Sequence, residues 1–144
     1  MAKPLVLTYH VPGDDFSWAG EASGQVKNTL KQLGFPADVV RRVAISLYEG
    51  EINMVIHAGG GDITVEIFAD HVTLCLQDKG PGIADVSLAM KAGFSTAPEH
   101  VRDLGFGAGM GLPNMEKYTD AIEVDSVVGE GTTVKMLVKN QTEA

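Results

Sequence analysis

Two oxygen-bearing side chains one helical turn apart, Glu49 and Asn53, are the residues whose spacing most directly suggests chemistry. Residues four apart on a helix lie above one another on one face. A carboxylate and an amide oxygen placed in this way could hold a hard cation or take a proton from a hydroxyl group. A solvated polar stripe on an amphipathic helix would show the same spacing, so the pair alone does not decide. The whole stripe consists of Arg42, Ser46, Glu49, Asn53 and His57.

A run of four glycines at every second position, Gly105, Gly107, Gly109 and Gly111, is the second candidate. It suits neither helix nor strand, because each glycine loses backbone entropy on folding and packs no side chain. The run leads into a predicted helix over 111–118, and a glycine-rich loop at a helix N-terminus suits a phosphate. A flexible surface loop is the alternative. The run matches neither common phosphate-loop template, because no Lys-Ser/Thr follows it and its spacing is not Gly-x-Gly-x-x-Gly.

Two further polar segments, residues 78–82 and 129–133, stand next to predicted strands. Asp78 could accept a hydrogen bond from an amine-bearing ligand, while Gly80 and Gly82 would let that ligand approach the backbone. An ordinary Asp/Gly turn and an ordinary hairpin connection explain the same residues equally well. Each segment is therefore a weak signal when it is considered alone.

Hydrophobic periodicity predicts the elements that must position these groups. Alternating residues predict strands over 5–11, 63–67, 72–76, 121–127 and 132–138. Helical spacing and stop signals predict helices over 21–33, 35–58, 86–92 and 111–118, whereas 93–104 lacks periodicity and is predicted to be a mobile loop. Clean alternation implies a sheet with one face on helices and the other partly wet. We therefore expect an α+β two-layer sandwich, as a single domain over 1–144.

Composition excludes several functional classes. The 144 residues carry a formal net charge of -8, which argues against a nucleic-acid partner because a phosphate backbone needs a basic face. Cys75 is the single cysteine, which excludes an intramolecular disulfide and a cysteine-rich zinc site and fits a reducing cytoplasm. The four histidines do not have metal-ligand spacing. No apolar run approaches membrane-spanning length, so we expect a soluble cytoplasmic protein without a membrane partner.

In their order along the chain, these weak signals resemble the GHKL (Bergerat) ATP-binding fold. The matching order is Glu49-x-x-x-Asn53, then Asp78-x-Gly80-x-Gly82, then the glycine run, then a Gly-Thr pair at the last hairpin. Within that superfamily, the chain is most similar to the small anti-sigma serine/threonine kinases of the SpoIIAB, RsbW and RsbT type. The segments that carry this second resemblance are 92–96, 109–113 and 128–134. The resemblance implies a mixed, mostly antiparallel sheet with helices on one face.

The resemblance also implies a role for each motif residue. Asn53 would coordinate the Mg²⁺ that bridges the ATP phosphates, and Glu49 would be the general base that takes the proton of an incoming serine hydroxyl. Asp78 would bind the exocyclic amine of adenine, with Thr132 or Thr133 completing the pocket. The remaining ATP contacts would come from Gly80 and Gly82 under the base and from Gly105, Gly107, Gly109 and Gly111 around the phosphates. No motif decides whether Lys91 or Arg102 reaches the terminal phosphate, and a solvated surface position is the alternative for both.

One departure from the family pattern is Gly50, which follows the expected base inside a helix and costs about 1 kcal/mol against alanine. We expect it to make room for a ligand or for a neighbouring helix. Lys79 also places a positive charge beside Asp78, which leaves the adenine contact plausible.

Two functions remain open at the level of sequence. The first is a protein-serine/threonine kinase that phosphorylates a STAS-domain antagonist and switches partners. The second is a Mg·ATP-dependent module that docks on a sigma factor or a PP2C-type phosphatase with little or no transfer. A histidine-kinase catalytic domain is a weaker third interpretation, because no phospho-accepting helix is apparent before the fold. Dimerisation is expected only because it is common in the family that the chain resembles.

Overall fold

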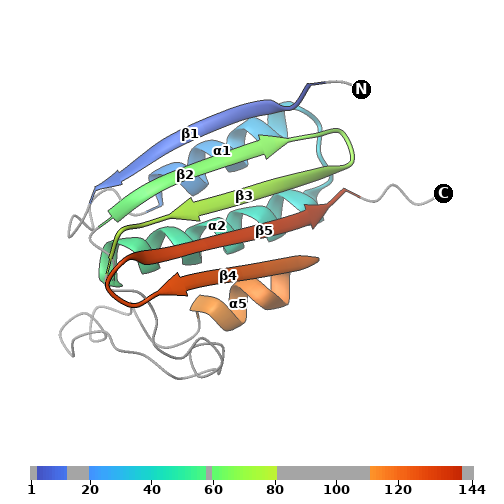
Figure 1. The fold of residues 1–144 in the computed structure, drawn as a ribbon. Helices are drawn as coiled ribbons and strands as arrows, with labels where there is room; N and C mark the ends of the chain where they lie inside the picture. Colours follow the sequence, from blue (N-terminus) through green and yellow to red (C-terminus); the bar gives the residue numbers. More distant parts are fainter. Residues whose placement is uncertain (1–2, 13–19, 58–59, 81–110, 141–144) are drawn as a thin grey trace, which may run out of the picture.

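A computed structural model describes residues 3–12, 20–57, 60–80 and 111–140 of the chain. In chain order, the elements are β1 (Leu5–Pro12), α1 (Glu21–Gln32), α2 (Ala37–His57), β2 (Gly60–Ile67), β3 (His71–Gln77), α5 (Gly111–Tyr118), β4 (Ala121–Val127) and β5 (Gly131–Lys139). Figure 1 shows these elements as one sheet with the helices on a single face. The predicted helix over 86–92 and the predicted loop over 93–104 lie outside the described residues.

The strands form a five-stranded sheet in the order β1-β2-β3-β5-β4. The predicted α+β sandwich is confirmed, and the four pairings between the described strands are all antiparallel where a mixed, mostly antiparallel sheet was expected. Alternate residues of the central strands are buried, as in β3 with Val72, Leu74 and Leu76. These side chains pack against apolar residues of α1, α2 and α5, so the core lies between the sheet and the helices.

The two long helices are separated by a short, well-defined turn. Gly34 follows α1 with φ of +82°, a conformation that glycine adopts without steric cost. Its N–H donates to the Lys31 carbonyl, and the Phe35 N–H donates to the Leu30 carbonyl, the pattern of a Schellman motif. α2 then begins directly after Pro36. Within the described ranges, no helix is long and apolar enough to cross a membrane.

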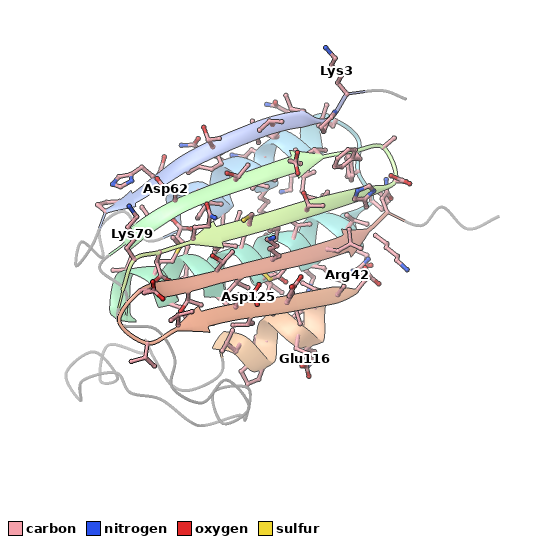
Figure 2. All side chains as sticks on the ribbon, in the orientation of Figure 1. Lys3, Arg42, Asp62, Lys79, Glu116 and Asp125 are labelled. Carbon is pink, nitrogen blue, oxygen red and sulfur yellow. The ribbon has the colours of Figure 1, made fainter. Side chains whose placement is uncertain are left out.

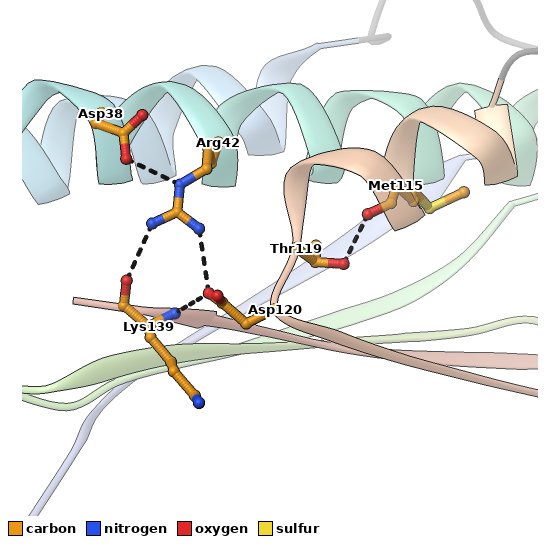
Figure 3. A network of polar contacts seen from close by, with 6 residues as sticks. All are labelled: Asp38, Arg42, Met115, Thr119, Asp120 and Lys139. Atoms are coloured by element: carbon orange, nitrogen blue, oxygen red, sulfur yellow. Dashed lines mark hydrogen bonds and ion pairs between the residues drawn. The ribbon is translucent and has the colours of Figure 1, made fainter. Parts of the chain in front are cut away.

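Arg42 fixes the N-terminal part of α2, away from Glu49 and Asn53, to the sheet (Figure 3). The Arg42 guanidinium donates to the carboxylates of Asp38 and Asp120 at 3.0 and 3.1 Å and to the Lys139 carbonyl at 3.1 Å. Partial burial would raise the pKa of Asp120, but the Lys139 N–H and the Arg42 guanidinium outweigh it and lower that pKa. Arg42 therefore belongs to a structural network, although it shares helical spacing with the candidate residues.

The sheet face that carries no helix is predominantly polar. One row across it runs from Asp62 through Gln77 and Thr133 to Asp125, because these residues are register partners on successive strands. Figure 2 shows Asp62 and Asp125 on this face. The alternation that buries the other face therefore leaves this one accessible to water, as predicted for a two-layer fold.

Candidate functional site

The predicted site elements converge at one end of the sheet. Figure 1 shows the C-terminal end of β3, the start of β5 and the start of α5 together at the left of the molecule. The C-terminal half of α2 runs behind the same end, and α2 and α5 are in contact. Residues from distant parts of the chain are therefore brought to one region.

Asp78, directly after β3, is held in place by backbone groups. Its N–H donates to the Thr132 carbonyl at 2.9 Å. Its Oδ1 atom accepts the Gly80 N–H at 2.9 Å and the Thr132 N–H at 3.1 Å. Within the described part of the chain, no hydrogen bond reaches Oδ2, the second oxygen of this half-buried carboxylate.

Gly131 allows β5 to approach the Asp78 turn this closely. A Cβ atom at Gly131 would overlap the Asp78 carbonyl oxygen and would lie 2.9 Å from the Lys79 Cα. The residue also has φ of +129°, which disfavours any L side chain. The hairpin interpretation of 129–131 thus missed a role for Gly131, which no local sequence signal distinguishes from a turn glycine.

The two threonines of the final hairpin lie on opposite faces of the sheet. Thr132 is buried beside Asp78, and its hydroxyl shares a hydrogen bond of 2.8 Å with the Ser126 hydroxyl. Thr133 belongs to the polar row on the open face, where it pairs with Gln77. Successive residues of a strand point to opposite faces of the sheet. The geometry therefore favours Thr132 over Thr133 for the pocket.

Glu49 lies half-buried on α2 and faces α5. Asn114 Nδ2 donates a hydrogen bond of 3.3 Å to the Glu49 Oε1 atom. Burial raises the pKa of the Glu49 carboxyl, and the Asn114 hydrogen bond partly opposes this by favouring the charged form. A carboxylate with a raised pKa is a better proton acceptor than an exposed one. Asn114 was missed at the level of sequence, because only the packing of α5 brings it to Glu49.

Asn53 lies one turn beyond Glu49 on α2 and is half-buried. Its side chain makes no hydrogen bond within the ranges that the structure describes. No cluster of three or more His, Cys, Asp or Glu that could hold a metal occurs among the described residues. A single amide oxygen does fit Mg²⁺, which prefers oxygen ligands and usually keeps waters and substrate phosphates in its shell.

Gly50 makes room for a side chain of a neighbouring element. A Cβ atom at this position would overlap the Leu76 side chain on β3 and would lie 3.6 Å from the Met115 Sδ atom on α5. We expected room for a ligand or for a neighbouring helix, and the element that requires the room is instead the strand β3. The missing side chain lets α2 approach β3 at the turn that carries Glu49, while the Met115 side chain of α5 lies at ordinary contact distance.

Glu51 is a buried carboxylate that the sequence did not single out. Its side chain is 1% exposed, and its two oxygens each accept a backbone N–H at 3.2 Å, one from Ala22 and one from Ser23. These are among the first N–H groups of α1, which has no side-chain cap of its own at Gly20. Glu51 therefore caps α1 from within α2, because its two oxygens satisfy two N–H groups at the start of that helix.

Several candidate residues are not placed. Gly82, Gly105, Gly107 and Gly109 lie outside the described residues, as do Lys91 and Arg102. Gly111 is the first residue of α5, and Gly80 donates its N–H to Asp78. The structure thus brings the α2 pair and the Asp78–Thr132 pair to one end of the sheet.

The sequence of this chain matches a known family over most of its length. A family model described as a histidine kinase-like ATPase domain matches residues 19–138. The chain belongs to this family. The ATPase domain is 33% identical over 115 residues to "Serine/threonine-protein kinase RsbT" of Bacillus subtilis (strain 168), covering 77% of this chain and 80% of that protein. It is 36% identical over 111 residues to "Anti-sigma F factor" of Clostridium beijerinckii, covering 73% and 74% respectively.

Solved structures share the fold of the ATPase domain. The structure of the RsbU and RsbW domains of a Mycobacterium tuberculosis protein gives a TM-score of 0.61 at 15% identity, covering 99% of this chain and 34% of that chain. The mycobacterial sensor histidine kinase MprB gives a TM-score of 0.54 at 16% identity, covering 96% and 100%. At these identities the likeness concerns the fold alone. The resemblance stated from the motifs is confirmed for the family and for the fold.

Proposed function

We propose that this ATPase domain is a protein serine/threonine kinase of the anti-sigma type, which transfers the γ-phosphate of ATP to a STAS-domain protein. The observation that carries the proposal is the half-buried Glu49 carboxylate, which lies one turn from Asn53 and accepts a hydrogen bond from Asn114. A nucleotide-binding module has less need of such a base. The names of the relatives, a serine/threonine kinase and an anti-sigma factor, support the same class of function.

Asp78 is proposed to recognise adenine. Its Oδ1 atom is engaged by two backbone N–H groups, which fixes the carboxylate and leaves Oδ2 to accept the exocyclic amine. Guanine carries a carbonyl at that position and would repel the carboxylate. This arrangement supports a preference for ATP over GTP, with buried Thr132 on the same side of the sheet.

Asn53 is proposed to hold the Mg²⁺ that accompanies ATP, through its amide oxygen. The metal would supply charge neutralisation for the phosphates. The glycines from Gly105 to Gly111 are proposed to wrap the phosphates, and Gly80 and Gly82 to lie under the base; Gly82, Gly105, Gly107 and Gly109 lie outside the described residues.

In the transfer step, Glu49 would accept the proton of the serine or threonine hydroxyl. The hydroxyl oxygen then bonds to the γ-phosphorus as the bond from that phosphorus to the β–γ bridging oxygen breaks, and ADP leaves. Phosphoryl transfer needs mainly positioning and charge stabilisation, so one carboxylate is sufficient as the side chain that takes part in proton transfer. Burial around Glu49 favours this role, because it raises the pKa and so makes the carboxylate a stronger base.

A radiolabelled-ATP transfer assay tests the proposal. The chain is incubated with Mg·ATP and candidate STAS-domain proteins, and label on a serine or threonine of the partner is the expected result. Calorimetry on the same sample reports ATP binding independently. Tight Mg·ATP binding without transfer to any partner would favour the alternative, a binding module that docks on a sigma factor or a PP2C-type phosphatase.

A further inference from the structure

The first turn of α5 is tied to the middle of α2 by one polar contact. Asn114, the fourth residue of α5, donates from Nδ2 to Glu49 Oε1 at 3.3 Å. In the part of the chain that the structure describes, this is the one side-chain hydrogen bond between α5 and α2. α5 begins at Gly111, the last glycine of the run, so Asn114 stands three residues from the proposed phosphate loop.

The packing around this contact limits how far Asn114 can move. Leu112 and Met115, on either side of it in α5, are 7% and 1% exposed, so the helix is anchored in the core. Met115 packs where Gly50 lacks a side chain, beside Glu49 on α2. An anchored helix therefore presents the amide to a carboxylate on an equally anchored helix, and the contact does not depend on two flexible surface side chains.

We propose that Asn114 is a positioning residue for phosphoryl transfer: its amide holds the Glu49 carboxylate and connects the proposed base to the helix that follows the glycine run. The expected effect on phosphate transfer rests on the proposed function. The hydrogen bond between Asn114 and Glu49 does not depend on it. Asn114 touches neither ATP nor the acceptor in this proposal, so it acts only through Glu49.

The physical reason lies in the balance of forces on a half-buried carboxylate. Burial disfavours the charged form, whereas an N–H donor at hydrogen-bond distance favours it. The titratable neighbours on α2 are Tyr48 and Glu51, and the charged side chains of α5, Glu116 and Lys117, are exposed. Among the described residues, Asn114 is therefore the hydrogen-bond donor that favours the charged form of Glu49 and partly offsets the effect of burial on its pKa.

The sharpest variants are Asn114→Leu, which removes the donor at similar size, and Asn114→Asp, which keeps the shape and replaces the donor with a negative charge. Asn28→Asp is the matched control, because Asn28 is exposed on α1 and the same charge is added away from Glu49. Thermal unfolding verifies that each variant folds. The two Asn114 variants change the contact in different ways. If one of them misfolds, the other still tests the proposal.

The first measurement is an NMR titration of the Glu49 side-chain carboxyl in the nucleotide-free chain. We expect the midpoint to move to higher pH in Asn114→Leu and further in Asn114→Asp, while Asn28→Asp leaves it unchanged. This readout requires no kinase activity. An unchanged midpoint in a folded Asn114 variant overturns the proposal, whether or not the chain proves to be a kinase.

The second measurement is the pH profile of phosphate transfer. Because Glu49 must be deprotonated to act, removal of the donor moves the acidic limb to higher pH. Loss of the hydrogen bond also leaves the carboxylate less well oriented toward the acceptor hydroxyl, which should lower the plateau value of kcat on the order of tenfold. KM for ATP should stay within about twofold, since Asn114 does not touch the nucleotide in this proposal. A rise in KM at unchanged kcat would show that Asn114 binds nucleotide directly and would contradict the positioning role. Absence of transfer in the wild type would reject the proposed function. The NMR titration would then still test whether Asn114 acts on the Glu49 carboxylate.

Discussion

Asp78 and Thr132 exchange two hydrogen bonds across the end of the sheet. The Asp78 N–H donates to the Thr132 carbonyl at 2.9 Å, and the Thr132 N–H donates to the Asp78 Oδ1 atom at 3.1 Å. The carboxylate is therefore oriented by the start of β5 before any ligand arrives. A preorganised acceptor of this kind loses little entropy on binding.

Asp78→Asn tests the proposed adenine contact. The amide oxygen can still accept the Thr132 and Gly80 N–H groups, which turns the amide nitrogen toward the position of the exocyclic amine. Two donors then face each other, so ATP affinity should fall by roughly tenfold to a hundredfold with little loss of stability. Calorimetric titration with ATP and GTP measures this, and wild-type affinity for ATP would count against the contact.

Gly131→Ala should disturb the same turn from the other side. The new methyl group would overlap the Asp78 carbonyl oxygen, so we expect a loss of roughly 1–3 kcal/mol in unfolding free energy beyond the control, together with weaker ATP binding. Gly129→Ala is the matched control, because its φ is also positive at +83° but no atom lies within 4 Å of its Cβ position. Denaturant unfolding measures the free energy of unfolding of both variants. Equal losses would show that backbone strain alone, and not the contact with Asp78, accounts for the requirement for glycine at position 131.

Gly50→Ala and Gly24→Ala separate packing from helix propensity. An added methyl at Gly50 would overlap Leu76 and should destabilise the fold by roughly 1–3 kcal/mol. Gly24, in α1, has no atom within 4 Å of its Cβ position, so alanine there should stabilise the chain by up to about 1 kcal/mol. Denaturant unfolding of both variants decides the matter, and a stabilising Gly50→Ala would refute the close approach of α2 to β3.

Glu51→Gln should destabilise the chain by about 1–3 kcal/mol, because the amide offers one acceptor where the carboxylate serves the N–H groups of both Ala22 and Ser23. Glu21→Gln, at the exposed first turn of α1, is the control and should change stability by less than about 0.5 kcal/mol. Hydrogen exchange should also accelerate at the start of α1 in Glu51→Gln alone. Equal protection in both variants would argue against remote capping.

The predicted helices and strands mostly match the described elements, because their apolar periods are regular. α2 was expected over 35–58 and spans Ala37–His57, and the alternation in β3 and β5 gave the buried face correctly. The antiparallel direction of all four pairings between described strands could not be read from periodicity, since alternation specifies the face on which a residue lies and not the direction of the neighbouring strand.

Residue spacing alone predicts the site only where its residues are close in sequence, and the family resemblance supplied Asp78 and Thr132. Glu49 and Asn53 share one helix, so their spacing is local information. Glu51 is two residues from Glu49, about 200° around the helix, and it serves α1. The contacts of Glu51 with α1 and of Asn114 with Glu49 are long-range, and they depend on packing that no local pattern encodes.

The measurement that tests the central claim most directly compares wild type, Glu49→Gln and Asn53→Ala in parallel assays of Mg·ATP binding and phosphate transfer. Glu49→Gln should bind Mg·ATP at close to wild-type strength and lose transfer by about a hundredfold to ten-thousandfold, the usual contribution of a general base. Asn53→Ala should lose Mg·ATP binding itself. Transfer by Glu49→Gln at the wild-type rate would contradict the assignment of Glu49 as the base.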